Sequence, residues 1–308
     1  MPSQNQPIRN RVYQNHHFDS TRWDLVTPRD GDIVVATSLK AGTTWTQAIV
    51  ANLLYPGKSF PAPVWQINQW VDYRGIPWEV VNEYLEMPLA RRTMKTHLPL
   101  DGLRFFPDAK YIYVSRDGRD VALSLWNHYV NYSDLVYSEI NDTPGLVGEK
   151  CPYPPEDFHA YWHDWCTRGW FDWEQDGYPF WSHLYNVQSW WPYRHLPNIL
   201  FLHYADMKRD LTGSIGKIAT FLGLDRDSEA IRAVAEEVSI ESMRNDADNY
   251  VPDGGTSWKG GAKTFLHKGV NGRWKDILSP AELMLYDQAC DRVLTPGCRK
   301  WLEFGGTV

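Results

Sequence analysis

Apolar residues in this chain gather in short runs that alternate with stretches of helical periodicity. Three runs rich in β-branched and aromatic residues, 32–37, 110–114 and 199–204, predict buried strands. The first two lead directly into segments at 43–55 and 120–129, where apolar residues recur every three or four positions. Strands followed by helices in this way predict a parallel sheet covered by helices on both faces.

The rest of the chain predicts further helices around one core. Helical periodicity occurs at 79–86, 157–166, 180–194, 213–222, 228–238 and 280–292. The polar residues 1–22 lack it, and we expect a flexible N-terminal arm followed by one domain over 23–308. Two long segments rich in Pro, Gly, Tyr and Asn, about 57–92 and 131–156, have no clear pattern. Loops of that length inside a compact domain are usually functional covers, so we expect a ligand pocket beneath them.

Composition narrows the classes of function. The 308 residues include 31 Lys and Arg against 38 Asp and Glu, a net charge of −7. This balance gives no general positive field for nucleic acid or acidic lipid, so any bound anion must be held by a local pocket. No apolar run is long enough for a membrane span or a signal peptide, and we expect a cytoplasmic location. The four cysteines form no CxxC pair, and we interpret them as reduced thiols outside any metal site.

The most informative passage lies where the first predicted strand ends and a helix begins, with the sequence VATSLKAGTTW. Unpaired backbone N–H groups and the positive end of the helix dipole face the same small volume there, which favours an anion. Lys40 adds a charge, Gly42 lets a ligand approach the backbone, and Thr43 and Thr44 add hydroxyl donors. A surface lysine followed by a threonine helix cap explains the same residues equally well. The pattern is not GxxxxGK[ST], so a nucleotide-hydrolysing loop is disfavoured.

A second strand-to-helix junction reads VSRDGRDVALS. Arg116 leaves the end of the strand, and Ser124 lies inside the following helix, where it can point back to the same edge. The guanidinium fork of arginine suits a phosphate, although pairing of Arg116 with Asp117 or Asp120 is an equally good explanation. Two anion sites side by side on one sheet edge indicate a ligand with two phosphate groups.

Two other passages carry chemistry of lower specificity. His97, within RTMKTHLP, has an imidazole that can accept a proton at neutral pH, although a lone histidine is more often structural. The passage TFLHKGVNGRWK at 264–275 is basic and punctuated by glycine, and in isolation it predicts only a solvated turn.

Together and in this order, the passages resemble the sulfotransferases that use 3′-phosphoadenosine 5′-phosphosulfate (PAPS). LKAGTTW is similar to the TYPKSGTTW loop of that family, KTHLP to its catalytic-histidine segment, and YIYVSRDGRDVALS to its 3′-phosphate segment. LFLHYADM and HKGVNGRWKD resemble two later segments, so the likeness spans about residues 30–280. It implies a single α/β domain, with a central parallel β-sheet flanked by helices and a P-loop-kinase-like phosphate-binding loop.

Carried over residue by residue, the resemblance implies two phosphate sites and a general base. The 5′-phosphosulfate would be held by Lys40, Ala41, Gly42, Thr43 and Thr44, with Trp45 beside the adenine. The 3′-phosphate would be held by Arg116, Ser124, Lys268 and the backbone of Gly269, and Tyr204 would reach the adenine. His97 would take the proton of the acceptor, with Lys40 and Lys95 near the transferring sulfuryl group.

The later segments depart from the family's pattern. The family's RKG is His267, Lys268 and Gly269 here, so a permanent charge at the 3′-phosphate becomes a titratable or neutral one. We expect Arg273 to replace part of that charge. Ile240 stands where the family often places an aromatic residue over the adenine. The dimer motif KxxxTVxxxE is absent from the sequence, which leaves the oligomeric state open.

The sequence therefore predicts metal-independent transfer of a sulfuryl group from PAPS, with adenosine 3′,5′-bisphosphate (PAP) as product. The acceptor is a small molecule with a phenol, alcohol, glycolipid or amine group. An aromatic lining from Trp65, Trp70, Trp78, Tyr129 and Tyr132 predicts a partly aromatic or apolar acceptor. The alternatives are an ATP-dependent small-molecule kinase and a noncatalytic carbohydrate- or lipid-binding module built on the 16 tryptophans.

Overall fold

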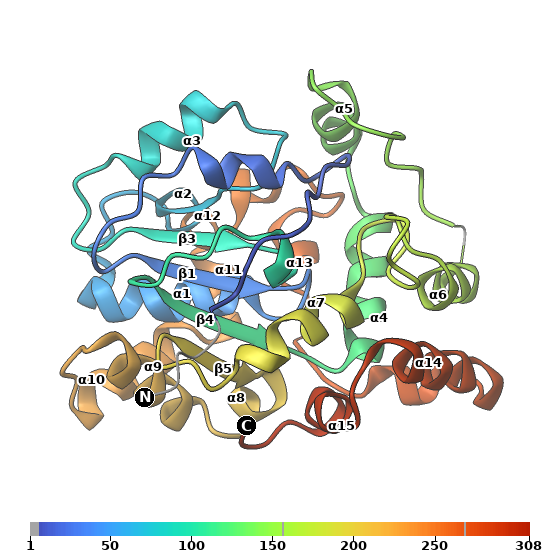
Figure 1. Cartoon of the computed structure of the whole chain (residues 1–308). Helices are drawn as coiled ribbons and strands as arrows, with labels where there is room; N and C mark the ends of the chain where they lie inside the picture. Colours follow the sequence, from blue (N-terminus) through green and yellow to red (C-terminus); the bar gives the residue numbers. More distant parts are fainter. Residues whose placement is uncertain (1–5, 156, 268) are drawn as a thin grey trace.

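A five-stranded parallel sheet runs through the middle of the protein, with its strands in the order β2-β3-β1-β4-β5 (Figure 1). The computed structural model describes residues 6–155, 157–267 and 269–308. The strands are β1 (Ile33–Thr37), β2 (Asn68–Trp70), β3 (Thr93–Thr96), β4 (Lys110–Ser115) and β5 (Ile199–His203). The predicted α/β fold with a central parallel sheet is confirmed.

Helices connect the strands and follow the last one (Figure 1). In chain order they are α1 (Thr43–Leu54), α2 (Val64–Ile67), α3 (Trp78–Leu85), α4 (Gly118–Val130), α5 (Asp134–Asp142), α6 (Phe158–Thr167), α7 (His183–Trp190), α8 (Tyr204–Arg209), α9 (Leu211–Leu222), α10 (Ser228–Glu237), α11 (Ile240–Asn245), α12 (Ala247–Tyr250), α13 (Ala262–Phe265), α14 (Pro280–Val293) and α15 (Pro296–Phe304). Each predicted helix is present, with ends shifted by a few residues.

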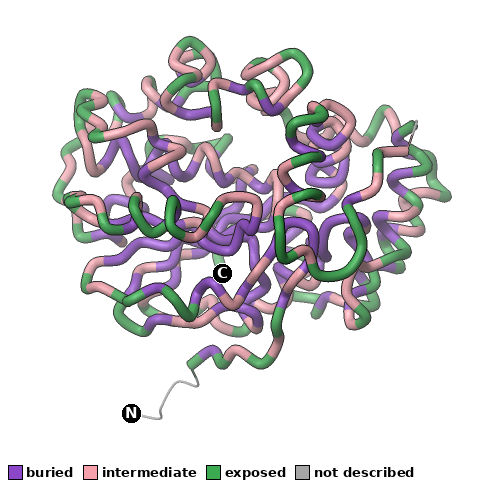
Figure 2. Tube along the Cα trace, turned by 90° about the horizontal axis from the view of Figure 1, so that it is seen from above, coloured by how far each residue is buried: buried purple, intermediate pink, exposed green. Residues whose placement is uncertain are grey.

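The two faces of the sheet bury different sets of side chains, because successive residues of a strand point to opposite faces. Val35 and Ile112 pack in a core with α1 and α9, whereas Val34 and Tyr111 pack with α7 and the C-terminal helices. Every residue of β1 is buried, as expected for a central parallel strand. Figure 2 shows the buried residues gathered in the interior and the exposed ones on the outer turns.

Parallel pairing brings the functional passages to one edge of the sheet. In the register of β1, Ala36 lies opposite Thr96 of β3, and Thr37 lies opposite Val114 of β4. The chain after each of these strands therefore starts from the same carboxyl edge. Open α/β sheets bind their ligands at this edge.

The N-terminal segment differs from the expected flexible arm. Tyr13 and Phe18 are fully buried. The Asp19 backbone N–H donates to the Asp72 carbonyl at 2.9 Å. The Arg74 backbone N–H donates in turn to the His17 carbonyl at 2.8 Å. The prediction of a flexible arm is wrong for this segment. The side chains of Tyr13 and Phe18 stand among polar residues in the sequence, but they are enough to anchor the segment in the core.

Strands β2 and β3 lie where the sequence predicted no strand. Their residues, NQW and TMKT, are polar and short, so neither a buried run nor clear alternation marks them. Both are stabilised by parallel pairing in the sheet. The long segments 57–92 and 131–156 also contain α2, α3 and α5, and are more ordered than the loops we expected.

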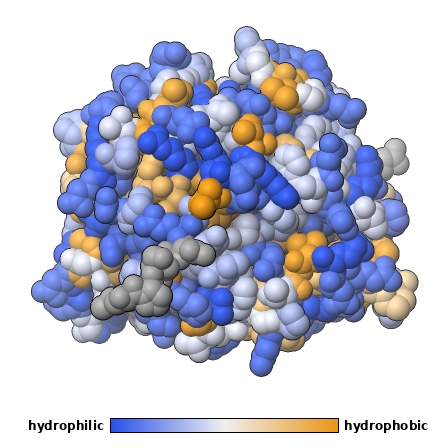
Figure 3. Space-filling view, in the orientation of Figure 1, coloured by the Kyte–Doolittle hydropathy of each residue, from blue (hydrophilic) through white to orange (hydrophobic). Residues whose placement is uncertain are grey.

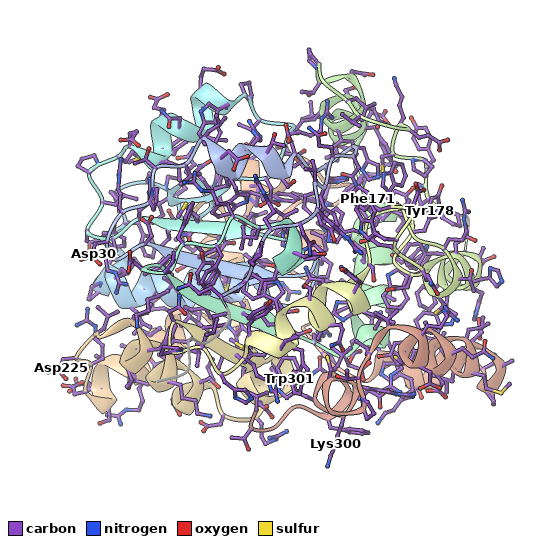
Figure 4. The ribbon with its side chains drawn as sticks, viewed as in Figure 1. Asp30, Phe171, Tyr178, Asp225, Lys300 and Trp301 are labelled. Atoms are coloured by element: carbon purple, nitrogen blue, oxygen red, sulfur yellow. The ribbon has the colours of Figure 1, made fainter. Side chains whose placement is uncertain are left out.

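Most of the tryptophans in the helical region 158–191 belong to the core. Trp162, Trp165 and Trp190 are fully buried, which agrees with core packing. Trp301 of α15, marked in Figure 4, packs against Phe201 of β5 with ring centroids 5.4 Å apart. All four cysteines are buried and unpaired.

The face drawn in Figure 3 is mainly hydrophilic, with apolar residues in small separate groups. None of the helices in the described parts of the chain is both long and apolar enough to cross a membrane. A cytoplasmic location stays a prediction.

Candidate active site

A cavity of about 770 Å³ opens at the carboxyl edge of the sheet and contains nearly all of the predicted site. The predicted residues that line it are Lys40, Gly42, Thr43, Thr44, Trp45, Lys95, His97, Arg116, Ser124, Tyr204, His267 and Gly269. Ala41 is fully buried next to them, as part of the turn rather than of the cavity wall. Lys268 lies outside the described residues. Both long segments also contribute to the wall, so the pocket lies beneath them as expected.

The turn between β1 and α1 has the backbone geometry of an anion site. Lys40 and Gly42 adopt left-handed φ values of 62° and 116°. Gly42 is the N-cap of α1 and offers no side-chain cap, so the first N–H groups of the helix remain available. A Cβ atom on Gly42 would lie 3.0 Å from Tyr204 Cδ2, and the turn therefore needs glycine.

The Lys40 ammonium lies inside the cavity between aromatic rings. Its Nζ is 3.3 Å from His128 Nδ1 and 5.0 Å from the centroid of the Phe265 ring. Burial lowers the pKa of Lys40 to about 8, with further lowering by the charges of Arg116 and Lys95. The structure thus brings the charges of both predicted anion junctions close together.

His97 is held by the end of β1. Its Nδ1 is 2.9 Å from the Thr37 carbonyl oxygen, which can only accept, so Nδ1 carries the proton and Nε2 has a free lone pair. Thr37 Oγ1 in turn lies 2.6 Å from Thr43 Oγ1, which connects the histidine to the first turn of α1. Burial first, and then the charge of Lys95, lower the pKa of His97 to about 3. The imidazole is therefore neutral at pH 7.

Lys95 lies two residues before His97 on β3 and also faces the cavity. Its Nζ is 5.0 Å from the centroid of the Trp70 ring, which meets the His97 ring edge to face at 4.7 Å. Burial lowers the pKa of Lys95 to about 8, against an opposing effect of Asp72.

Arg116 is fixed by the loop that follows α13. Its Nε donates to Asn271 Oδ1 at 3.0 Å and its Nη2 to the Val270 carbonyl at 2.9 Å. The guanidinium carbon is 4.5 Å from the centroid of the Tyr204 ring. Arg116 Nη2 lies 4.0 Å from Asp120 Oδ1, which is a long distance for an ion pair. The Asp120 carboxylate also accepts a hydrogen bond from the Gly272 backbone N–H at 2.9 Å. The basic loop, which predicts only a solvated turn in isolation but which the resemblance places at the 3′-phosphate, therefore contacts Arg116.

Three residues that differ from the sequence pattern the chain resembles also line the cavity. Arg273 Nη1 lies 3.4 Å from His267 Nδ1, and both residues line the cavity together with Ile240. Trp45 donates its indole N–H to the Val238 carbonyl at 2.9 Å, and its ring centroid lies 5.4 Å from that of Tyr204. Trp45, Tyr204 and Ile240 thus give this part of the cavity aromatic and aliphatic surface, against which a flat ring can pack.

Sequence reasoning missed His183, which joins the two anion junctions from α7. Its Nδ1 lies 2.5 Å from Ser38 Oγ, in the turn before α1, and its Nε2 donates to the Arg116 carbonyl at 3.0 Å. His183 is buried against the ring of Trp165. The sequence around His183 shows only the pattern of an aromatic-rich helix, so it gives no indication that this histidine contacts the site.

Two further histidines in the cavity were also missed. His128 lies four residues after Ser124 on α4, hence on the same helix face, and this spacing could have revealed it. His17 comes from the N-terminal segment that was expected to be flexible. Of the aromatic residues predicted for the acceptor end, Trp65, Trp70 and Tyr132 line the cavity, whereas Trp78 and Tyr129 do not. Within the described residues, no group of three acidic, His or Cys side chains could hold a metal ion.

The sulfotransferase domain family matches residues 30–297, and the chain therefore belongs to this family. A glycolipid sulfotransferase of Mycobacterium bovis (strain BCG / Pasteur 1173P2) is 30% identical over 314 residues, covering 97% of this chain and 96% of that protein. Sulfotransferase 1B1 of Mus musculus is 31% identical over 270 residues, covering 83% of this chain and 80% of that protein.

The fold is shared with a solved structure. Mouse sulfotransferase SULT7A1 in complex with PAP superposes with a TM-score of 0.69 at 20% identity, covering 92% of this chain and 93% of the other. The predicted family and fold are confirmed. Membership favours an enzyme of sulfuryl transfer over the kinase and the noncatalytic module that the sequence left open.

Proposed function

We propose that the protein transfers a sulfuryl group from PAPS to a hydroxyl group of a small-molecule acceptor. The observation that carries this proposal is that Lys40, Arg116 and His97 line one cavity. The uncapped start of α1 and the glycine turn fit an anionic group, and the donor substrate supplies the sulfuryl group there.

Two clusters of this chain would hold the donor. Lys40, Thr43 and Thr44, with the N–H groups of α1, would bind the 5′-phosphosulfate end. Arg116 and Ser124 would bind the 3′-phosphate, helped by Lys268 and the backbone of Gly269, and His267 and Arg273 line the same cavity. Trp45 and Tyr204 would enclose the adenine.

The proposed chemistry needs a base, positive charge and exclusion of water. His97 Nε2 takes the proton of the acceptor hydroxyl, because Nδ1 is already committed to the Thr37 carbonyl. Negative charge on the donor offsets the nearby ammonium groups and raises the basicity of His97 during transfer. Lys40 stabilises charge on the departing phosphate oxygen, and Lys95 the charge around the sulfuryl group.

The test separates the sulfotransferase from its alternatives. PAP should raise the melting temperature of the protein, whereas ADP with Mg²⁺ should not. Labelled PAPS should then transfer its sulfuryl group to a hydroxyl-bearing acceptor from a screened library. Stabilisation by ADP with Mg²⁺ alone, or by neither nucleotide, contradicts the proposal.

A further inference from the structure

Three buried histidines line the cavity, and the proposed transfer uses only one of them. His97, His17 and His128 are 3%, 3% and 6% exposed. A neutral imidazole carries one N–H group and one lone pair, so the partner of one ring nitrogen determines what the other can do. Their hydrogen bonds therefore define what His17 and His128 offer to a bound molecule.

His128 presents a hydrogen-bond donor. Burial and the charge of Lys40 lower the pKa of His128 well below its ordinary value, so the ring is neutral. Its Nδ1 faces the Lys40 ammonium at 3.3 Å, and an ammonium can only donate. The proton of His128 consequently lies on Nε2. Within the described residues this N–H has no hydrogen-bond partner.

His17 presents a hydrogen-bond acceptor. The neighbouring His16 has its Nε2 at 2.8 Å from the Pro179 carbonyl, so His16 carries its proton there and accepts at Nδ1. His17 Nδ1 lies 2.5 Å from that atom and must be the donor. The lone pair of His17 is therefore on Nε2, which has no hydrogen-bond partner in the described part of the chain.

Aromatic rings line the same cavity as these two imidazoles. Trp70 and Tyr73 are stacked with centroids 4.5 Å apart, and the His128 ring lies 5.1 Å from that of Tyr132 and 5.0 Å from that of Trp258. Ring faces bind flat apolar surface, whereas the imidazole edges require hydroxyl partners. A saturated ring with C–H faces and several hydroxyl groups satisfies both.

We propose that the acceptor is a polyhydroxylated ring of the chemical class of sugars, bound through His17 Nε2 and the His128 Nε2–H. This inference rests on the proposed function, which places the hydroxyl to be sulfated at His97. A monohydric acceptor of the same size leaves both polar atoms buried without partners, and such a site discriminates strongly against it.

The experiment compares matched acceptors at saturating PAPS. The polyhydroxylated probes are the hexyl β-glycosides of glucose, galactose and mannose, and the monohydric probe is (4-hexylcyclohexyl)methanol. We expect kcat/KM to be at least about tenfold higher for one of the glycosides. His17→Phe and His128→Phe keep an aromatic ring and should each lower the glycoside-to-alcohol ratio about tenfold, while His195→Phe, at an exposed position, should keep the ratio of the wild type.

The outcomes separate this inference from the proposed function. Transfer that favours the monohydric alcohol, or equal ratios in the wild type and both cavity variants, overturns the sugar assignment and leaves sulfuryl transfer standing. Labelling of no acceptor, with PAP still binding, also overturns the assignment. No labelling and no PAP binding overturn both. If a cavity variant fails to fold, the ratio of the wild type and that of the other variant still decide.

Discussion

The two buried lysines give donor binding a definite dependence on pH. Burial lowers the pKa of both Lys40 and Lys95 from the usual 10.5 to about 8. An anion binds to the ammonium form, which is complete below that pKa and is lost as the pH rises through it. A phosphate monoester has its second pKa near 6, so the charge of PAP is constant above about pH 7.5.

The magnitude follows from the fraction of lysine that stays charged. With a pKa of about 8, a lysine is about nine-tenths charged at pH 7 and about one-tenth charged at pH 9. The dissociation constant of PAP should therefore rise about tenfold over this interval, because Lys40 is the lysine assigned to the phosphate end that PAP keeps. An ordinary surface lysine changes little in the same range.

Isothermal titration calorimetry with PAP at pH 7, 8 and 9 measures this dependence. Lys40→Arg keeps a permanent charge and should therefore remove most of the rise in Kd, because Lys95 is assigned to the sulfuryl group, which PAP lacks. Lys217→Arg, on the exposed side of α9, should leave the full dependence in place. A wild-type Kd that changes by less than about twofold between pH 7 and pH 9 refutes the lowered pKa values and the anion site built on them.

Three further expectations concern single residues. His97→Gln should lower kcat by on the order of 100-fold or more while the Kd of PAP stays within about twofold, and a preserved kcat in stopped-time assays would remove the general-base role. His183→Ala should raise the Kd of PAP by about fivefold or more, because it removes the hydrogen bonds that connect the two anion junctions. His183→Asn should restore part of the affinity, because its side-chain oxygen can accept a hydrogen bond from Ser38. Equal effects of the two variants contradict the positioning role. Gly42→Ala forces a residue with a Cβ to φ 116° and places that atom 3.0 Å from Tyr204, which should cost about 1–3 kcal/mol by thermal denaturation and weaken PAP binding, whereas an unchanged melting temperature shows that the turn relaxes freely.

Local pattern predicted the parts of the fold whose environment is uniform. β1, β4 and β5 are almost entirely buried, and a buried environment selects apolar β-branched and aromatic residues that are visible in sequence. The sequence did not predict β2 and β3, because they are short and polar and because their pairing depends on strands far away in the chain. The order of the N-terminal segment also depends on a distant partner, because Phe18 packs against Trp181 with ring centroids 3.9 Å apart.

The motifs predicted the donor side of the cavity better than the acceptor side. Lys40 and Arg116 belong to strand-to-helix turns, where local chemistry suffices to indicate an anion. His17 and His128 instead come from two separate segments, and only the folded chain brings them to the same cavity. The direction of each imidazole N–H depends on such distant partners, which no spacing along the chain can reveal.

The buried cysteines make the protein convenient to label. A thiolate is the reactive form, and burial raises the pKa of Cys151, Cys290 and Cys298 to about 12 and also raises that of Cys166. Maleimides and similar reagents should therefore leave the folded protein almost untouched. A fluorophore attached to one new surface cysteine would then report on a single chosen position, without removing any of the native four.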